Sequence, residues 1–380
     1  MADIPLSLYI HIPWCIRKCP YCDFNSHAVK EEIPEALYIK QLIADLEADL
    51  AFVQERQLIS IFMGGGTPSL FSPDSINKIL HEVENRIAFS KSIEITLEAN
   101  PGTVEQERFE GFRAAGVNRL SIGCQSFQTT KLKSLGRIHD EARAIEAVKM
   151  AKEAGFQNLN IDLMFGLPDQ TIQDALFDLK TAISLEPTHI SWYQLTLEPN
   201  TLFHVKPPTL PNDEIIWEMQ QQGLALLKQH HYLQYEVSAY SQVGFQCHHN
   251  LNYWKFGDYL GIGAGAHSKI TDLETAVIKR FWKLKQPKAY LEAKEWIGEK
   301  KIINENSLPF EFMLNALRLS ESIDKNLFSS RTGLPWKMIS PVIKKAESSN
   351  LLIEQEKSIS LTPQGRNFLN DLVAMFLESS

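Results

Sequence analysis

The chain has 380 residues, of which 44% are hydrophobic and 22% are charged, and its formal net charge is -8. This composition is ordinary for a soluble protein of two or three domains, and the negative balance argues against a general nucleic-acid or membrane-surface binder. No apolar run reaches the ~18 residues that cross a bilayer, and the first residues lack a signal-peptide pattern. We therefore expect a cytoplasmic protein. A peripheral membrane contact is compatible with these features, and so is either a monomer or a dimer.

Short apolar, β-branched runs alternate with amphipathic stretches along the first half of the chain. The runs predict buried strands over Leu6–Pro13, Ile59–Met63, Ile93–Ala99, Leu120–Gln125, Leu159–Phe165 and Ile190–Leu197. Helical patterns separate them, at about 34–54, 73–88, 104–115, 139–154 and 171–184. This alternation predicts a parallel sheet with right-handed crossovers. Because six units are fewer than a closed (β/α)8 barrel needs, we expect an α/β fold with an open, partial (β/α)6 barrel.

Three of the five cysteines follow the first predicted strand, and Cys15, Cys19 and Cys22 have the spacing C-x3-C-x2-C. Thiolates suit iron–sulfur clusters, copper(I) or zinc. Three cysteines can hold a four-iron cluster that leaves one iron open to an exchangeable ligand. Structural zinc usually takes four ligands, and His11 or His27 could complete such a set. A disulfide does not fit a reducing compartment, and the cysteines alone favour cluster and zinc equally.

Unusual residues also stand at the ends of the other predicted strands. The run Gly64–Pro68 follows the second strand, Glu98 ends the third, Gln125 ends the fourth, and Asp162 lies in the fifth. Each has an ordinary explanation, because a glycine run can be a plain turn and a buried carboxylate can pair with a basic helix residue. The carboxyl ends of parallel strands converge, however, so we expect one site at this edge of the sheet.

Taken together, these motifs resemble the radical S-adenosylmethionine (SAM) superfamily. The resemblance rests on C-x3-C-x2-C after the first strand, GGGTP after the second, and the partial parallel barrel. It implies that Cys15, Cys19 and Cys22 hold a [4Fe-4S] cluster, whose open iron is chelated by the amino and carboxylate groups of SAM. It also implies that the cluster can cleave SAM to a 5′-deoxyadenosyl radical.

More narrowly, YIHIPWC, GGGTPS, LEANP, GCQSF, LGRIH and NIDLMFGLP are similar to segments of oxygen-independent coproporphyrinogen III oxidase (HemN) and its relative HemW. This resemblance runs from about residue 6 to the C-terminus. It implies that Tyr9, Gly65 and Glu98 hold the methionine part of the cluster-bound SAM. The positions of a second SAM in the oxidase correspond here to Gly66, Thr67, Gln125, Arg137 and Asp162. In this chain those residues would hold SAM or line the cavity. Without the resemblance, Arg137 would be interpreted as a surface residue.

Two departures separate the chain from the oxidase. The oxidase has a fourth cysteine where this chain has Phe24, and it has an N-terminal extension where only 14 residues precede Cys15 here. Both departures fit the HemW family, whose members are haem chaperones and are not known to decarboxylate coproporphyrinogen. We therefore expect a haem chaperone, rather than an enzyme, that passes haem to an acceptor haem protein, for which a respiratory protein is one candidate. A coproporphyrinogen III dehydrogenase is the alternative, and a zinc-bound structural protein is the third hypothesis.

The segment His249–Trp254 matches the motif H-N-x-x-Y-W that is linked to haem binding in HemW. A neutral imidazole is a good axial ligand for haem iron, and aromatic rings can stack on a porphyrin. His249 is the first choice of ligand, and Cys247 and His248 are the alternatives. Without the resemblance, a core histidine would be the better interpretation. The following segment, Tyr259–Ser268, resembles another wall of the SAM cavity, and its glycines allow close backbone approach.

The character of the chain changes after about residue 285. Helical patterns at 287–298, 308–321, 324–332 and 335–348 are followed by short strands at Leu351–Glu354 and Ile359–Leu361 and by a helix at 363–377. This order predicts a winged-helix-like module. Such folds often bind DNA, but Glu347, Glu354 and Glu356 oppose contact with phosphates, so we expect a lid or a protein-docking surface. We divide the chain into a barrel core at 1–200, an extension with the haem motif at 201–285, and a C-terminal domain at 286–380.

Overall fold

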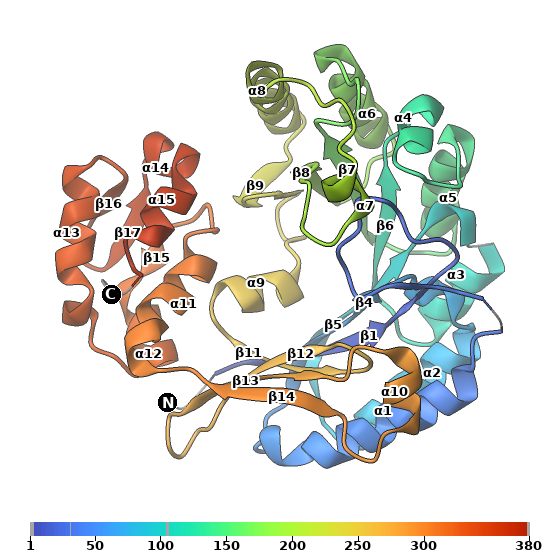
Figure 1. Cartoon of the computed structure of the whole chain (residues 1–380), viewed down its shortest axis with the longest axis horizontal. Coiled ribbons are helices and arrows are strands. Elements are labelled where there is room, and N and C mark those ends of the chain that lie inside the picture. Colours follow the sequence, from blue (N-terminus) through green and yellow to red (C-terminus); the bar gives the residue numbers. More distant parts are fainter. Residues whose placement is uncertain (1–3, 31, 104–105, 378–380) are drawn as a thin grey trace.

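One large sheet organises most of the chain (Figure 1). The computed structural model describes residues 4–30, 32–103 and 106–377. The sheet strands, in spatial order, are β14 (Ile297–Ile302), β13 (Ile278–Lys283), β12 (His267–Thr271), β11 (Asp258–Ile262), β1 (Leu6–Ile12), β4 (Leu58–Gly65), β5 (Phe89–Ala99), β6 (Arg119–Gln125), β7 (Asn158–Phe165), β8 (His189–Gln194), β10 (Ala239–Ser241) and β9 (Leu233–Glu236). The strands from β11 to β8 are parallel, and antiparallel strands flank them on both sides.

The six predicted strands are therefore confirmed, and they form the middle of an open, partial barrel. β11 adds a seventh parallel strand beside β1, although it lies about 250 residues later in the chain. Its partners in register include Leu6 with Asp258 and Ile10 with Ile262. Because the sheet ends on one side at β14 and on the other at β9, it does not close on itself.

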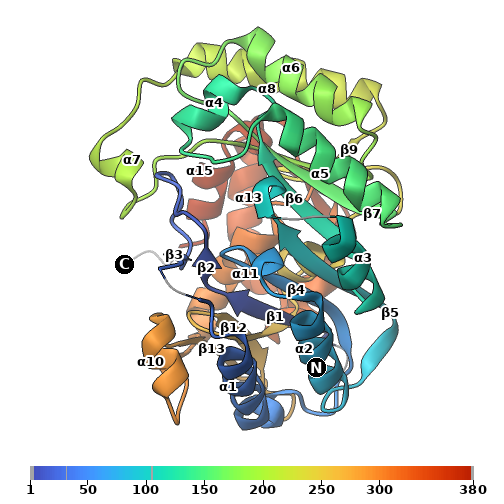
Figure 2. The ribbon, with the colours of Figure 1, turned by 90° about the vertical axis from the view of Figure 1, so that its right-hand side faces the viewer.

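Helices cover the outer face of the parallel strands (Figure 2). They are α1 (Glu35–Asp49), α2 (Pro73–Glu84), α3 (Gln106–Ala114), α4 (Thr129–Ser134), α5 (Glu141–Glu153), α6 (Ile172–Ser184) and α8 (Asp213–Gln229), with the short α7 (Leu202–Val205) in a loop. Their starts follow capping chemistry: Ser72 accepts a hydrogen bond from Ser75 N, and Thr171 and Asp174 form a capping box. The predicted helix at 104–115 is confirmed from residue 106 onward, and residues 104 and 105 lie outside the described part.

The two faces of the parallel strands differ in chemistry. On β1, Leu6, Leu8 and Ile10 belong to the apolar core beneath the helices. Ser7 alternates with them and accepts a hydrogen bond from Ser60 Oγ at 2.8 Å. Successive side chains of a strand point to opposite faces of the sheet. The apolar residues of β1 therefore face the helices, and the polar residues face the inside of the barrel, where a ligand can be held.

Helix α9 (His248–Trp254) closes this interior against β1, β4 and β11. The Glu94 carboxylate of β5 accepts hydrogen bonds from the backbone N–H groups of His248 and His249, both at 3.1 Å. Asn252 donates to Ser7 Oγ at 2.9 Å and to the carbonyl of Asp258 at 2.8 Å. The H-N-x-x-Y-W segment is thus a short helix fixed to the barrel wall.

The C-terminal region has its own apolar core, which includes Phe312, Phe328 and Ile343. Its elements are α11 (Leu308–Ala316), β15 (Ile323–Asp324), α12 (Lys325–Thr332), α13 (Ser340–Ser348), β16 (Leu352–Glu354), β17 (Ser358–Leu361), α14 (Pro363–Asn367) and α15 (Leu369–Ala374). A small sheet of order β15-β17-β16 completes it. This confirms the predicted helices followed by a hairpin, and Figure 1 shows the region facing the open side of the barrel.

One predicted helix is wrong in its second half. The pattern at 287–298 gives α10 (Pro287–Glu292), but residues 297–302 form strand β14 on the edge of the large sheet. Every residue of β14 is exposed, and it carries Lys300 and Lys301, which suits an edge strand that must not pair further. Because Ile303 packs in the apolar core of the C-terminal region, we propose that the C-terminal domain begins near residue 303.

No helix among residues 4–30, 32–103 and 106–377 is long and apolar enough to cross a membrane.

Candidate functional site

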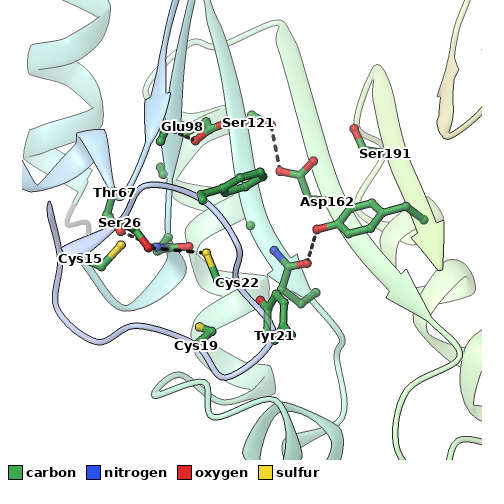
Figure 3. Close-up of a pocket in the computed structure, with 18 of the residues that line it drawn as sticks. Cys15, Cys19, Tyr21, Cys22, Ser26, Thr67, Glu98, Ser121, Asp162 and Ser191 are labelled. Carbon is green, nitrogen blue, oxygen red and sulfur yellow. Dashed lines mark hydrogen bonds between the residues drawn. The ribbon is translucent and has the colours of Figure 1, made fainter. Parts of the chain in front are cut away.

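A cavity of about 490 Å³ lies where the parallel strands end (Figure 3). The loop after β1 forms one wall, the ends of β4 to β8 form the floor, and α9 with residues after β9 forms the remaining wall. The prediction that these strand ends converge is therefore confirmed. Seven of the nine residues predicted to bind a cofactor line this cavity: Gly65, Gly66, Thr67, Glu98, Gln125, Arg137 and Asp162.

The three cysteines Cys15, Cys19 and Cys22 all line the same cavity (Figure 3). Their loop runs from β2 (Trp14–Cys15) to β3 (His27–Ala28). Burial raises the pKa of the Cys15 and Cys22 thiols above the ordinary value. A bound metal centre opposes this effect, because it stabilises the thiolate form and so lowers the pKa of the thiol.

The three cysteines have the donor chemistry that an iron–sulfur cluster takes. Among the described residues, no group of three His, Cys, Asp or Glu side chains is arranged to hold a metal ion. A four-iron cluster binds each thiolate to a different iron, so its cysteines surround a wider centre. His11 is also engaged elsewhere, since Nδ1 lies 3.1 Å from Tyr9 Oη and Nε2 lies 2.9 Å from the carbonyl of Asn25.

The glycine run packs against the start of the cysteine loop. Gly66 N donates to the carbonyl of Ile12 at 2.8 Å, and Thr67 N donates to that of Trp14 at 2.7 Å. A β-carbon on Gly66 would lie 2.5 Å from the Trp14 carbonyl oxygen, and one on Gly65 would meet the His11 ring. These glycines therefore allow the glycine run and the start of the cysteine loop to approach each other closely. They also leave this part of the cavity wall formed by backbone.

Two carboxylates face the cavity from β5 and β7, the strands on either side of β6. Glu98 accepts a hydrogen bond from Gly65 N at 3.2 Å, and Asp162 accepts from Ser121 Oγ at 2.9 Å and from Asn160 Nδ2 at 2.8 Å. No basic side chain among the described residues forms an ion pair with either. Burial, with the nearby Asp162 charge, raises the pKa of Glu98 to about 8, and burial also raises the pKa of Asp162. A ligand cation beside Glu98 would favour its ionised form.

Arg137 and Gln125 extend the polar wall. Arg137 is half-buried rather than an exposed surface residue, and it donates to Asn100 Oδ1 at 3.1 Å and to the carbonyl of Gly123 at 3.2 Å. Gln125 has a φ of 70°, which is rare for a residue with a side chain. Its Oε1 accepts a hydrogen bond from Tyr193 Oη at 2.8 Å. Backbone strain of this kind concentrates at functional sites.

Tyr9 and His249 are not among the cavity-lining residues. His249 is 1% exposed, its Nδ1 lies 3.0 Å from Ser60 Oγ, and its Nε2 has no hydrogen-bond partner in the part of the chain that the structure describes. Its ring packs on Phe62 and Tyr253 at centroid distances of 5.1 and 4.9 Å. Burial lowers the pKa of His249 to about 3, so the imidazole is neutral. The part of the haem motif that reaches the cavity is Asn250 and Trp254.

Sequence reasoning missed several residues of the cavity wall. Ser191 and Tyr193 lie in the sixth predicted strand, and its period of two could have identified them. Glu236 and Ser238 come from the segment around β9, where no motif marks them. They reach the cavity only because β9 and β10 add to the sheet beside β8.

Comparison with known proteins covers almost the whole chain. The family model of the Radical SAM superfamily matches residues 9–181, and that of the HemN C-terminal domain matches residues 303–368. The protein named heme chaperone HemW from Haemophilus influenzae is 54% identical over 98% of both chains, and that from Escherichia coli is 48% identical over 98% of both. The solved structure of E. coli coproporphyrinogen III oxidase (HemN), a radical SAM enzyme, has a TM-score of 0.83 and 23% identity. That match covers 98% of this chain and 90% of the oxidase chain, and it shows a shared fold.

Proposed function

This chain belongs to the HemW family of radical SAM proteins, and from that premise we propose that it is a haem chaperone, which binds haem and hands it to an acceptor haem protein. The observation that carries the proposal is the full-length similarity to several proteins named heme chaperone HemW. The cavity supports it, because three cysteines and a polar wall for a nucleotide-like ligand lie together.

The cysteine end of the cavity suits a [4Fe-4S] cluster with SAM. Cys15, Cys19 and Cys22 would hold the cluster, which supplies one-electron chemistry when it is bound. Glu98 and the Gly65 backbone would bind the methionine part of SAM, because a carboxylate that lacks an ion pair favours an ammonium group. Tyr9, behind this wall, would orient His11 rather than touch the ligand, since the two side chains are 3.1 Å apart.

The remaining polar residues would bind the rest of SAM or a second molecule of it. Gly66, Thr67, Gln125, Arg137 and Asp162 all line the cavity. Carboxylate and amide oxygens suit ribose hydroxyls, and a guanidinium suits a carboxylate. These roles rest on the position of each side chain and on the resemblance to the oxidase.

Haem would bind at the other end, near α9. His249 is the first choice of iron ligand because its imidazole is neutral and its Nε2 is unbonded among the described residues, with Cys247 and His248 as the alternatives. Since the His249 ring is packed inside the barrel, coordination of haem iron requires α9 to shift relative to β4.

The C-terminal domain, which contacts α9 through α11, would act as a lid or an acceptor-docking surface. Oligomeric state, the acceptor and the cytoplasmic location stay predictions.

The test is an anaerobic reconstitution of the full chain, followed by haem titration and transfer of haem to an acceptor apoprotein. We expect about four irons per chain when the cluster is formed, a Soret band on haem addition, and loss of that band from the chaperone as the acceptor gains it. A protein that forms the cluster but binds no haem would contradict the proposal. One zinc with neither iron nor sulfide would favour the structural-zinc hypothesis instead.

A coproporphyrinogen III dehydrogenase is the second candidate. It is favoured by the oxidase fold and by the cavity residues that the chain retains at the matching positions. Phe24 argues against it, since the oxidase has a cysteine there and this side chain is 62% exposed at the cavity rim. Anaerobic turnover with coproporphyrinogen, SAM and a reductant separates the two functions, because only the enzyme would form protoporphyrinogen.

A further inference from the structure

The cavity extends beyond the strand ends to a second wall formed by α9 and β9, and both elements contact the C-terminal region. Glu236 of β9 and both Asn250 and Trp254 of α9 line it. Arg318, just after α11, lies over the Trp254 indole with its guanidinium carbon 4.5 Å from the ring centroid. Its Nη2 is 3.7 Å from Oε2 of Glu236. We call Glu236, Trp254 and Arg318 the carboxylate clasp.

The C-terminal region holds Arg318 at this place through backbone contacts. Leu319 forms an isolated antiparallel bridge with Glu236, and Ser320 N donates to the carbonyl of Tyr235 at 2.9 Å. Arg366 in turn donates to the Ser320 carbonyl at 2.8 Å. These contacts tie the segment after α11 to β9, so the fold, rather than a flexible tail, holds the guanidinium against Trp254 and Glu236, which line the cavity.

The polar groups of the clasp are not satisfied by one another. Glu236 is 4% exposed, and its Oε2 has no hydrogen-bond partner among the described residues. The same is true of Trp254 Nε1 and Arg318 Nε. The contact of 3.7 Å between Arg318 and Glu236 is an ion pair, but it is too long for a hydrogen bond. Buried polar atoms without partners are costly, so a cluster of them beside a cavity indicates a missing ligand.

The donors define the chemistry of that ligand. An indole N–H and a guanidinium can only donate hydrogen bonds, and the Asn250 amide can donate as well. Together they suit an anionic group with several acceptor oxygens, and a guanidinium matches a carboxylate in particular. Glu236 would compete for Arg318 when the ligand is absent. Burial raises the pKa of Glu236, so it can take up a proton when Arg318 turns to the ligand.

We propose that Arg318 and Trp254 bind a propionate carboxylate of haem, with Glu236 holding Arg318 in place until haem arrives. The proposal rests on the proposed haem function and adds to it a second anchor, outside the H-N-x-x-Y-W imidazole. It also gives the C-terminal domain a direct role, because that domain supplies the charge that the propionate meets.

The test compares haem with its dimethyl ester, in which both propionates are neutral. The cluster-reconstituted full chain is titrated with each by Soret absorbance under anaerobic conditions. We expect the unmodified protein to bind haem about tenfold more tightly than the ester, as one charge-assisted contact would give. Arg318→Ala should lose that preference by weakening haem binding about tenfold while leaving ester binding unchanged. Arg143→Ala, at an exposed arginine of α5, is the matched control and should keep the preference.

Two further variants keep the proposal testable if Arg318→Ala disturbs the domain. Arg318→Lys should restore part of the preference, because it keeps the charge but not the planar fork. Glu236→Gln should tighten haem binding about threefold without changing ester binding, because Arg318 then has no competing carboxylate. Equal binding of haem and ester by the unmodified protein, or equal weakening of both by Arg318→Ala, would overturn the clasp while the haem function stands. Binding of neither compound would overturn the proposed function as well.

Discussion

The two ends of the cavity are built in different ways. At the cysteine end, ligand candidates stand in short motifs within the first half of the chain, each at the end of one strand, as with Cys15 and Glu98. At the α9 end, the wall residues Glu236 and Trp254 both contact Arg318, which comes from the C-terminal region. The first end depends on local turns and the second on domain packing, so a change at one end should leave the other functional. The following changes test that independence.

Cys19→Ala should have the largest effect, because the proposed cluster would lose one of its three thiolate ligands. We expect the visible absorbance of the reconstituted cluster to disappear while the far-ultraviolet circular dichroism stays close to that of the unmodified protein. Cys124→Ala is the matched control, since Cys124 is fully buried outside the cavity and its variant should keep the cluster. Full iron and sulfide content in Cys19→Ala would show that the ligand assignment is wrong.

Gly66→Ala should disrupt the cysteine end through the backbone. The added β-carbon would lie 2.5 Å from the Trp14 carbonyl oxygen, so the loop that carries Cys15 must move. We expect a loss of about 1–3 kcal/mol in the free energy of unfolding together with reduced cluster occupancy. Gly298→Ala, where the nearest atom is 3.5 Å away, should change neither quantity. Unfolding in denaturant and iron analysis measure the two effects, and normal occupancy in Gly66→Ala would contradict the packing argument.

His249→Ala should act on the α9 end alone. The substitution removes the contact with Ser60 and the packing on Phe62, which should cost about 2 kcal/mol of stability. Haem binding should weaken or its Soret band should shift, while cluster absorbance stays unchanged. An unaltered haem titration would direct the search for the iron ligand to Cys247 or His248. A lost cluster would show instead that the two ends are coupled.

Glu98→Gln should give the smallest effect, and its sign depends on pH. The pKa of Glu98 is raised from 4.5 to about 8, so the folded protein binds more protons than the unfolded chain between these pH values. Stability from this group therefore falls as the pH rises through that interval. The variant avoids this loss, so without ligands it should be more stable than the unmodified protein by about 1–2 kcal/mol at pH 9. At pH 4 that advantage should be absent.

The same Glu98→Gln variant should bind SAM more weakly, because the SAM ammonium group would lose the carboxylate that we propose as its partner. Thermal unfolding at pH 4 and pH 9 measures the first effect, and isothermal titration with SAM on the reconstituted protein measures the second. Equal stability gains at both pH values would show that Glu98 is not the titrating group. Unchanged SAM affinity would place the methionine part elsewhere in the cavity.

The sequence determined the parallel strands, the helices between them and the cysteine end of the site. Buried parallel strands are continuous apolar runs, and their carboxyl ends meet at one edge in any such sheet, so periodicity and motif position suffice. The cysteine trio, the glycine run and Asp162 could all be placed in one cavity for this reason. The winged-helix-like order of the last hundred residues followed from the same kind of local pattern.

Tertiary structure alone decided the rest. Residues 297–302 form an edge strand because β13 offers a partner, although the helix predicted from the sequence extends to residue 298. His249 is buried and Trp254 reaches the cavity because Glu94 fixes the start of α9 against the barrel. Arg318 meets Glu236 because the segment after α11 bridges to β9. These contacts join residues far apart in the chain, and their free energy depends on packing that no local pattern records.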